Sequence, residues 1–489
     1  MSKGIIYKKP KEKITPKQVG IRIVLLVVSA FLLAFFTKLT GLGMDRISEV
    51  IYTRSLIEIA LIFVVNLVLL AVILFTTKYV KHDAMSRDKM FAIVCASLVL
   101  TFFASWGFSE LINVYIAPLL LGSLLIATLV DKRLGILTQF FVSNMFFLIS
   151  ILWDRDIVIV SENIGAIITS LVSSVVIVML LSKSATRLKF TVVGIIVALV
   201  SSVIPMFIHL AAGIRDAYTI LVSGVWSVIA IVLSVSIYTL ILPIMEYAFR
   251  VNTVFIMSEL CSLETPLLKR LVQEAPGTFN HSLVVGNLAE LCADAIGEDT
   301  QLAKAAAYYH DIGKIENPEY FVENQKGVNP HDDIIPEVSV YMIVNHVTAG
   351  REILKKARVP DIIADIAAEH HGTTPVNYFL YKAQSYTEEE LDKIEYSYPG
   401  PKPKSKIAAI IMIADTVEAA SRARGNFDDM DEFRKFVRKL IKSKADADQF
   451  SDCPITFEDL KKIEDVLVEA VPSLYHARIK YDNDTRKKK

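Results

Sequence analysis

Apolar residues are distributed very unevenly along this chain of 489 residues. Before residue 248 they form long stretches, each close to the roughly 20 residues that a helix needs to cross a bilayer. We count eight such stretches, at approximately 21–39, 56–79, 90–108, 111–130, 134–152, 162–182, 190–211 and 219–247. The pattern predicts a cytoplasmic N-terminus over 1–20 and a transmembrane domain of about eight helices over 21–247. The first stretch has no A-x-A cleavage site and is expected to be a retained anchor.

Basic residues collect at alternate ends of these stretches. Lys and Arg are frequent before the first stretch and after the second, fourth and sixth. The intervening loops are poor in net positive charge, as in Ser109-Glu110, Asp154-Arg155-Asp156 and Arg215-Asp216. Because positive charge marks the cytoplasmic side, we expect a multi-pass cell-membrane protein with both termini inside. The third and fourth stretches lie so close together that a single merged span is the alternative.

The pattern changes after residue 248, where most charged residues and seven of the nine histidines lie. Helical periodicity dominates and no run alternates like a strand, so the whole chain is predicted to be all-α. We expect a helical connector at 248–275, a cytoplasmic helical domain at 276–480 and a basic tail at 481–489. The break at Ala275-Pro276-Gly277 offers Thr278 as a helix cap. Residues 373–404 are expected to be irregular, and the four scattered cysteines argue against a zinc ribbon or a disulfide framework.

Histidine and aspartate residues of this second half recur at predicted helix ends or among apolar neighbours. Asp415 follows the apolar run 407–414, where an unpaired buried carboxylate would be costly unless an ion compensated it. Imidazole and carboxylate together suit transition metals, and two ions bridged by a carboxylate suit phosphoryl transfer. The predicted metal ligands are His281, His310, Asp311, His346, His370, His371 and Asp415. Asp311 and Lys314 are the predicted catalytic residues, whereas His82, His331 and His476 are expected at the surface or in loops.

Several motifs resemble those of a known family. They are Phe279-Asn-His-Ser-Leu283, Tyr309-His-Asp-Ile-Gly-Lys314, Asn329-Pro-His331, Glu369-His-His-Gly-Thr-Thr374, Tyr398-Pro-Gly-Pro-Lys-Pro403 and Ala414-Asp-Thr-Val-Glu-Ala-Ala-Ser-Arg422. The set resembles the HD superfamily of metal phosphohydrolases in its dinuclear form. More specifically, it is similar to the seven-transmembrane HD receptor family of bacterial cyclic di-AMP phosphodiesterases. Members usually carry a large extracytoplasmic domain after the first span, so an interval of only about 40–55 implies a short form.

The resemblance implies a reaction and a division of ligands. The reaction would open cyclic di-AMP to the linear dinucleotide pApA, with two divalent ions, Mn or Fe, as cofactors. One ion would be held by His281, His310, Asp311 and Asp415, and the other by His346, His370, His371 and the bridging Asp311. Regulation through the membrane domain and a possible homodimer would follow, with no DNA or RNA partner.

The choice of substrate depends on residues beyond the ligands. Relatives that open cyclic di-GMP follow the histidine doublet with a Gly-x-Gly-Tyr-Pro signature, whereas here Gly372, Thr373 and Thr374 follow it. Thr373 and Thr374 are the candidate substrate-binding residues. Two alternatives remain open at this point: a receptor that binds a nucleotide without hydrolysis, and an HD hydrolase of another nucleotide.

Overall fold

The computed structural model describes residues 86–475, apart from 112–115, 154–156, 182–185 and 426–428, and parts of the segment 20–75. The predicted N-terminus, the first two predicted spans, the Asp154–Asp156 loop, the basic tail and the positions of His82 and His476 therefore lie wholly or partly outside the described residues. The chain divides into two compact units, Met1–Phe255 and Ile256–Lys489.

The predicted all-α class is confirmed. Within the described ranges, the only extended pairing is an isolated antiparallel bridge between Pro375 and Ser397. All other regular structure there is helical.

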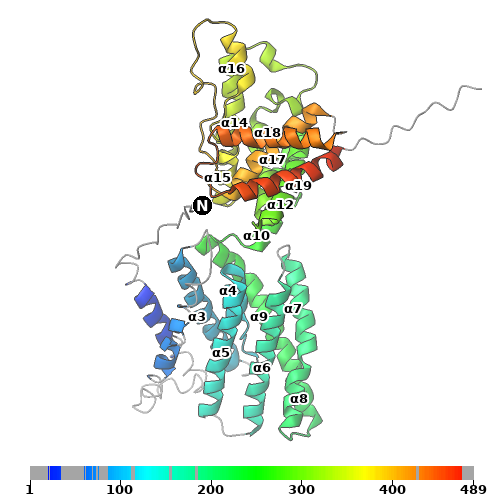
Figure 1. Ribbon diagram of the computed structural model, residues 1–489. Helices are drawn as coiled ribbons and strands as arrows, with labels where there is room; N and C mark the ends of the chain where they lie inside the picture. Colours follow the sequence, from blue (N-terminus) through cyan, green and yellow to red (C-terminus); the bar gives the residue numbers. More distant parts are fainter. Residues whose placement is uncertain are drawn as a thin grey trace, which may run out of the picture. The chain divides into compact units, whose positions relative to one another are not determined.

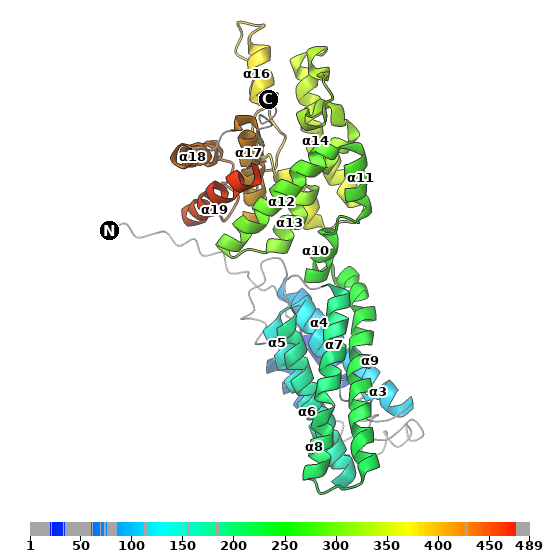
Figure 2. The same ribbon diagram turned by 90° about the vertical axis from the view of Figure 1, so that its right-hand side faces the viewer.

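The first unit is a bundle of helices that lie alongside one another in both views (Figures 1 and 2). Four of its described helical segments are long and apolar enough to cross a bilayer: Arg87–Ser105, Asn163–Leu180, Arg187–Ala211 and Ala217–Phe249. Large apolar side chains such as Phe207 and Leu240 are exposed on the outside of this unit, as lipid contact requires. The helices are α3 (Arg87–Leu111), α4 (Leu121–Leu129), α5 (Lys132–Trp153), α6 (Ile157–Leu180), α7 (Arg187–Ser201), α8 (Val203–Ala211) and α9 (Ala217–Phe249).

Helix α4 corrects one predicted span. The expected helix over 111–130 is wrong in part, since residues 116–120 are not α-helical and α4 has only nine residues. A helix of that length rises about 14 Å, roughly half the hydrocarbon thickness of a bilayer. Its residues are nearly all buried, and Ser123 shares a hydrogen bond with Ser174 of α6. The apolar run therefore reflects packing inside the bundle as well as insertion into lipid.

The second unit is built around α17 (Lys406–Arg424), whose residues Ile407–Asp415 are all buried. It packs against α12 (Pro276–Ile296), α13 (Thr300–Tyr309), α15 (Asp361–Glu369), α18 (Met430–Asp446) and α19 (Phe457–Tyr475), as Figure 2 shows for most of them. The remaining elements are α10 (Val254–Leu260), α11 (Pro266–Glu274), the 3-10 turns η3 (Ile312–Glu316), η4 (Pro318–Tyr320), η5 (Val322–Asn324) and η6 (Pro330–Asp332), α14 (Pro336–Lys356) and α16 (Asn377–Gln384).

Three local predictions in this unit differ from the structure. The connector is broken between α10 and α11, where Thr265 precedes a proline at the start of the second helix. Thr278 is not a cap, because α12 already begins at Pro276, and its hydroxyl donates to Glu323 Oε1 at 3.2 Å instead. The segment 373–404 contains α16, whose Phe379 and Leu380 are buried in a small core of their own. This small core also includes Val340 of α14, so it depends on a tertiary contact that the sequence of 373–404 does not reveal.

Candidate metal centre

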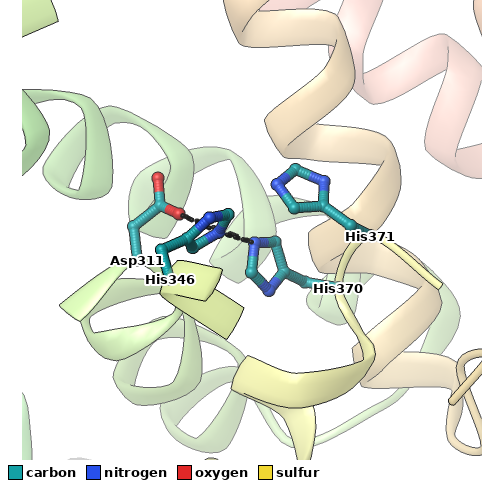
Figure 3. A group of neighbouring side chains, drawn as sticks. All are labelled: Asp311, His346, His370 and His371. Atoms are coloured by element: carbon teal, nitrogen blue, oxygen red, sulfur yellow. Dashed lines mark hydrogen bonds and ion pairs between the residues drawn. The ribbon is translucent and has the colours of Figure 1, made fainter. Parts of the chain in front are cut away.

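The structure brings all seven predicted ligands together from five helices and the turns that follow them. His281 lies in α12, His346 in α14 and Asp415 in α17, while His310 and His370 end α13 and α15. Their donor atoms form two groups, within each of which they lie within 4.8 Å of one another. We name them the Asp311 group (Asp311, His346, His370, His371; Figure 3) and the Asp415 group (His281, His310, Asp415).

Asp311 lies between the two groups. Its Oδ1 is 3.3 Å from His346 Nε2 and 3.5 Å from His370 Nε2. Its Oδ2 is 3.2 Å from His310 Nε2 and 3.7 Å from His281 Nε2. One carboxylate thus presents one oxygen to each set of imidazoles, which is the arrangement that a bridging ligand needs.

Three of the imidazole rings are oriented by main-chain carbonyl oxygens of the helices that carry them. His310, His346 and His370 each donate Nδ1–H to the carbonyl oxygen three residues earlier, at 2.6, 2.5 and 2.7 Å. Such a bond selects the tautomer and leaves the Nε2 lone pair free to bind a metal. His281 differs, because its Nδ1 lies 2.6 Å from a carboxylate oxygen of Glu418.

The donors fit a divalent cation on two grounds. His310 Nε2 and Asp311 Oδ1 are buried, and neither has a partner in hydrogen-bonding geometry among the described residues. Buried polar atoms are otherwise almost always paired. In addition, nitrogen and oxygen donors of this kind are those that Mn, Fe and Zn accept.

The pKa shifts of the donor residues also favour a cation at this site. Burial alone would raise the pKa of Asp311, but the His310 ring and the Lys314 ammonium hold it well below its usual range. Burial lowers the pKa of His370 to about 4, so that its ring is neutral at pH 7. His281 shows the opposite shift: its bonds to Asp415 and Glu418 outweigh burial and raise its pKa to about 10. A cation is therefore favoured at this position, and a metal ion would provide one.

Lys314 lies directly beside the bridging carboxylate. Its Nζ is 2.7 Å from Asp311 Oδ2 and 2.9 Å from Glu323 Oε1, and it lies over the Phe321 ring. Although burial opposes its charge, the two carboxylates raise the pKa of Lys314 above its ordinary value. The side chain therefore carries a fixed positive charge next to the donors.

Sequence reasoning missed several side chains of this site. Glu418 follows Asp415 by one helical turn, a spacing that could have indicated it. The Tyr398 ring stacks on His371 with centroids 4.2 Å apart. Lys444 of α18 is half-buried; burial lowers its pKa, and the Asp415 carboxylate acts in the opposite direction. Tyr398 begins the motif Tyr398–Pro403 noted in the sequence, but only the fold places its ring on His371. Lys444 left no signal in the sequence, because it comes from a distant segment.

The two predicted substrate-binding threonines have different surroundings. Thr373 is exposed, and its main-chain N–H donates to Gln449 Oε1 at 2.9 Å. Thr374 is buried, and its hydroxyl donates to the carbonyl oxygen of His371 at 2.8 Å. The Thr374 hydroxyl thus supports the histidine doublet, and a contact with substrate remains a prediction for both residues.

His331 is expected at the surface or in a loop; it lies in the loop turn η6 but not at the surface. Its side chain is buried, its Nε2–H donates to the Tyr320 carbonyl at 2.9 Å, and its ring packs on Phe379. The Asn-Pro-His turn of η6 folds inward under these two aromatic residues, which local sequence does not reveal. His331 belongs to neither donor group.

Helical membrane segments followed by a helical domain with this donor set are the features of a membrane protein with an HD-type metal centre. Residues 278–420 match the HD domain family, and residues 55–253 match the family described as "7TM receptor with intracellular HD hydrolase". This chain belongs to the seven-transmembrane HD receptor family.

Two curated relatives share the name cyclic-di-AMP phosphodiesterase PgpH. The protein of Bacillus subtilis (strain 168) is 35% identical over 380 residues, which are 77% of this chain and 52% of that protein. The protein of Listeria monocytogenes serotype 1/2a (strain 10403S) is 43% identical over 245 residues, or 50% of this chain and 34% of that protein. The chain thus spans about half or less of the length of these relatives.

A solved structure is also similar to part of the chain. It is that of the L. monocytogenes PgpH HD domain in complex with cyclic-di-AMP, 45% identical. The match covers 44% of this chain and 100% of that one, with a TM-score of 0.42.

Proposed function

We propose that this chain is a membrane-bound, metal-dependent phosphodiesterase that hydrolyses cyclic di-AMP to pApA. The observation that carries the proposal is the position of Asp311, with one carboxylate oxygen at each of two donor groups. The two curated PgpH relatives support the choice of substrate. A centre for two ions is the arrangement that phosphoryl transfer uses in many hydrolases.

The cofactors in this proposal are two divalent ions, Mn or Fe. Asp311 would be shared between them, and His346, His370 and His371 would hold one ion and His281, His310 and Asp415 the other. Such ions neutralise phosphate charge and lower the pKa of water, which supplies the nucleophile near neutral pH.

The residues around the donors bind and orient the dinucleotide. Lys314 keeps its charge beside Asp311 and offsets negative charge on the phosphoryl oxygens as it develops. Lys444, whose pKa burial lowers and the Asp415 carboxylate raises, is a second basic side chain proposed to contact the dinucleotide. The Tyr398 ring, stacked on His371, adds an aromatic face at the same place. Thr373 and Thr374 are the proposed contacts to the base.

The proposed location is the cell membrane, with the N-terminus and the HD domain in the cytoplasm, where the dinucleotide is found. The chain runs from α9 through α10 and α11 directly into α12, which carries His281. In this proposal, a conformational change in the membrane domain is transmitted along these consecutive helices to the metal ligand His281 and so regulates hydrolysis. A homodimer and the absence of a nucleic-acid partner belong to the same proposal.

Hydrolysis by the full chain tests the assignment. The protein is purified in detergent, loaded with Mn²⁺ and offered cyclic di-AMP, cyclic di-GMP, a guanosine alarmone and ATP, and products are identified by liquid chromatography with mass spectrometry. The proposal requires pApA from cyclic di-AMP and loss of that product after chelation. Tight binding of cyclic di-AMP without turnover would instead identify a nucleotide receptor, and preferred turnover of ATP or the alarmone would identify another HD hydrolase.

A further inference from the structure

Among the described carboxylates of the centre, only Glu418 lies within hydrogen-bonding distance of the Nδ1 atom of a predicted ligand histidine. Its Oε2 lies 2.6 Å from His281 Nδ1, on the side of the ring opposite to Asp415, whose Oδ1 lies 2.9 Å from Nε2. The Glu418 side chain is 2% exposed. The imidazole of His281 is therefore held at both nitrogens by carboxylates of a single helix, α17.

The spacing of Asp415 and Glu418 along α17 explains why both carboxylates reach the same imidazole ring. Asp415 and Glu418 are three residues apart and lie on the same helix face, turned towards α12. Arg422 follows one turn later, with its Nη1 3.8 Å from Glu418 Oε1. The arginine thus lies near the second oxygen of Glu418, while Oε2 faces His281.

The contact makes the two donor groups unequal. In the Asp311 group, His346 and His370 donate Nδ1–H to neutral main-chain carbonyls. In the Asp415 group, His281 donates to a buried anion, a charge-assisted bond of about twice the strength of a neutral one. A carboxylate partner also increases the basicity of the ring and so its affinity as a ligand.

We propose that Glu418 is a positioning residue that selectively raises the metal affinity of the Asp415 group. The inference rests on the proposed metal centre. In this role Glu418 does not contact the substrate, and its effect on the metal passes through His281. Loss of such a partner lowers metal affinity by about 10–100-fold.

Metal binding by the full chain in detergent tests the role without reference to activity. The protein is stripped with a chelator, and Mn²⁺ binding is followed by equilibrium dialysis and elemental analysis. The wild type is expected to bind two ions. In Glu418→Gln one site keeps its affinity, and the other weakens about 10–100-fold.

Glu464→Gln is the matched control. Glu464 is also a nearly buried carboxylate of this unit, but it pairs with Arg438 and contacts no histidine among the described residues. Its replacement is expected to lower thermal stability and to leave both Mn²⁺ affinities unchanged. An equal fall in Mn²⁺ affinity in this variant would show that loss of stability alone accounts for the effect, and would overturn the inference.

A double-mutant cycle separates positioning through His281 from a general structural effect. In a His281→Ala background, Glu418→Gln is expected to cause no further loss of affinity, because the ring that Glu418 orients is absent. A further loss would overturn the inference. If Glu418→Gln does not fold, Glu418→Asp replaces it, since it keeps the charge but moves it away from Nδ1; the inference then requires one weakened site.

The proposed function and this inference fail in different ways. A wild-type chain that binds no ion contradicts the metal centre itself. A wild type that binds two ions, with Glu418→Gln indistinguishable from it, contradicts only the role of Glu418.

Discussion

A Cβ atom placed on Gly313 would lie 1.9 Å from the carbonyl oxygen of His346 and 2.6 Å from the main-chain nitrogen of Gly350. The 3-10 turn after Asp311 therefore touches the backbone of α14 directly. This contact sets the distance between Asp311 and His346, whose donor atoms are 3.3 Å apart.

Gly313→Ala is expected to separate this turn from α14. Overpacking of this kind costs about 1–3 kcal/mol in the free energy of unfolding, and the Asp311 group should lose its ion because Asp311 and His346 move apart. Urea unfolding and elemental analysis measure the two effects. Gly297→Ala is the control: it meets open space but has a φ of 75°, so it should cost about 1–2 kcal/mol and keep both ions.

Asp311→Ala is expected to abolish hydrolysis and to reduce bound metal to one ion or none, because this carboxylate faces both donor groups. Metal content and pApA formation are measured on the same preparation. Asp365→Ala, which removes an exposed carboxylate paired with Arg351, should change neither. Full activity in Asp311→Ala would show that the dinuclear arrangement is wrong.

Lys314→Met is expected to lower kcat by about 10²–10³-fold, the usual loss when one stabilising charge is removed from a reaction centre. Bound metal should stay at the wild-type level, since Lys314 is a cation and holds no ion. Steady-state kinetics with cyclic di-AMP, together with metal analysis, checks both expectations. An unchanged kcat would remove Lys314 from the reaction and leave it as a structural partner of Asp311 and Glu323.

Cyclic di-AMP is expected to exceed cyclic di-GMP in kcat/KM by at least ~10-fold, or about 1.4 kcal/mol in transition-state binding. The metal ions would bind a phosphate of either dinucleotide alike, so the discrimination has to come from hydrogen bonds to the bases. A pocket that pairs with the correct base rejects the other because its own polar groups are left unpaired. Competition between the two dinucleotides in one reaction measures the ratio directly, and a ratio near one would contradict the assignment of substrate.

The topology predicts opposite labelling at the two ends of α7 and α8. In a chain without native cysteines, a cysteine at Asp216, the exposed cap of α9, should react with an impermeant thiol reagent added to whole cells. A cysteine at Lys189, exposed near the start of α7, should be protected until the cells are opened. Together α7 and α8 cover Arg187–Ala211, 25 residues, which is long enough to place the two positions on opposite sides. Labelling in the reverse order would invert the proposed orientation.

Much of the centre could be predicted from the sequence. Asp415 stands at the end of an apolar run, and a helix so apolar is buried on all sides, so its carboxylate required a cation. The histidines at predicted helix ends followed the same logic. The all-α class was equally accessible, because helical periodicity is a property of neighbouring residues.

The tertiary structure decided what depends on distant segments. The fit of Gly313 against α14, the approach of Tyr398 and Lys444, the inward turn of His331 and the shortness of α4 all involve partners far away in the chain. The difference between the donor groups is of the same kind: Glu418 is a buried acid one turn from Asp415 in the sequence, and it bears on the metal centre only because α12 places His281 against it. Helical periodicity fixes which residues share a face of one helix, whereas packing decides which face of another helix meets it.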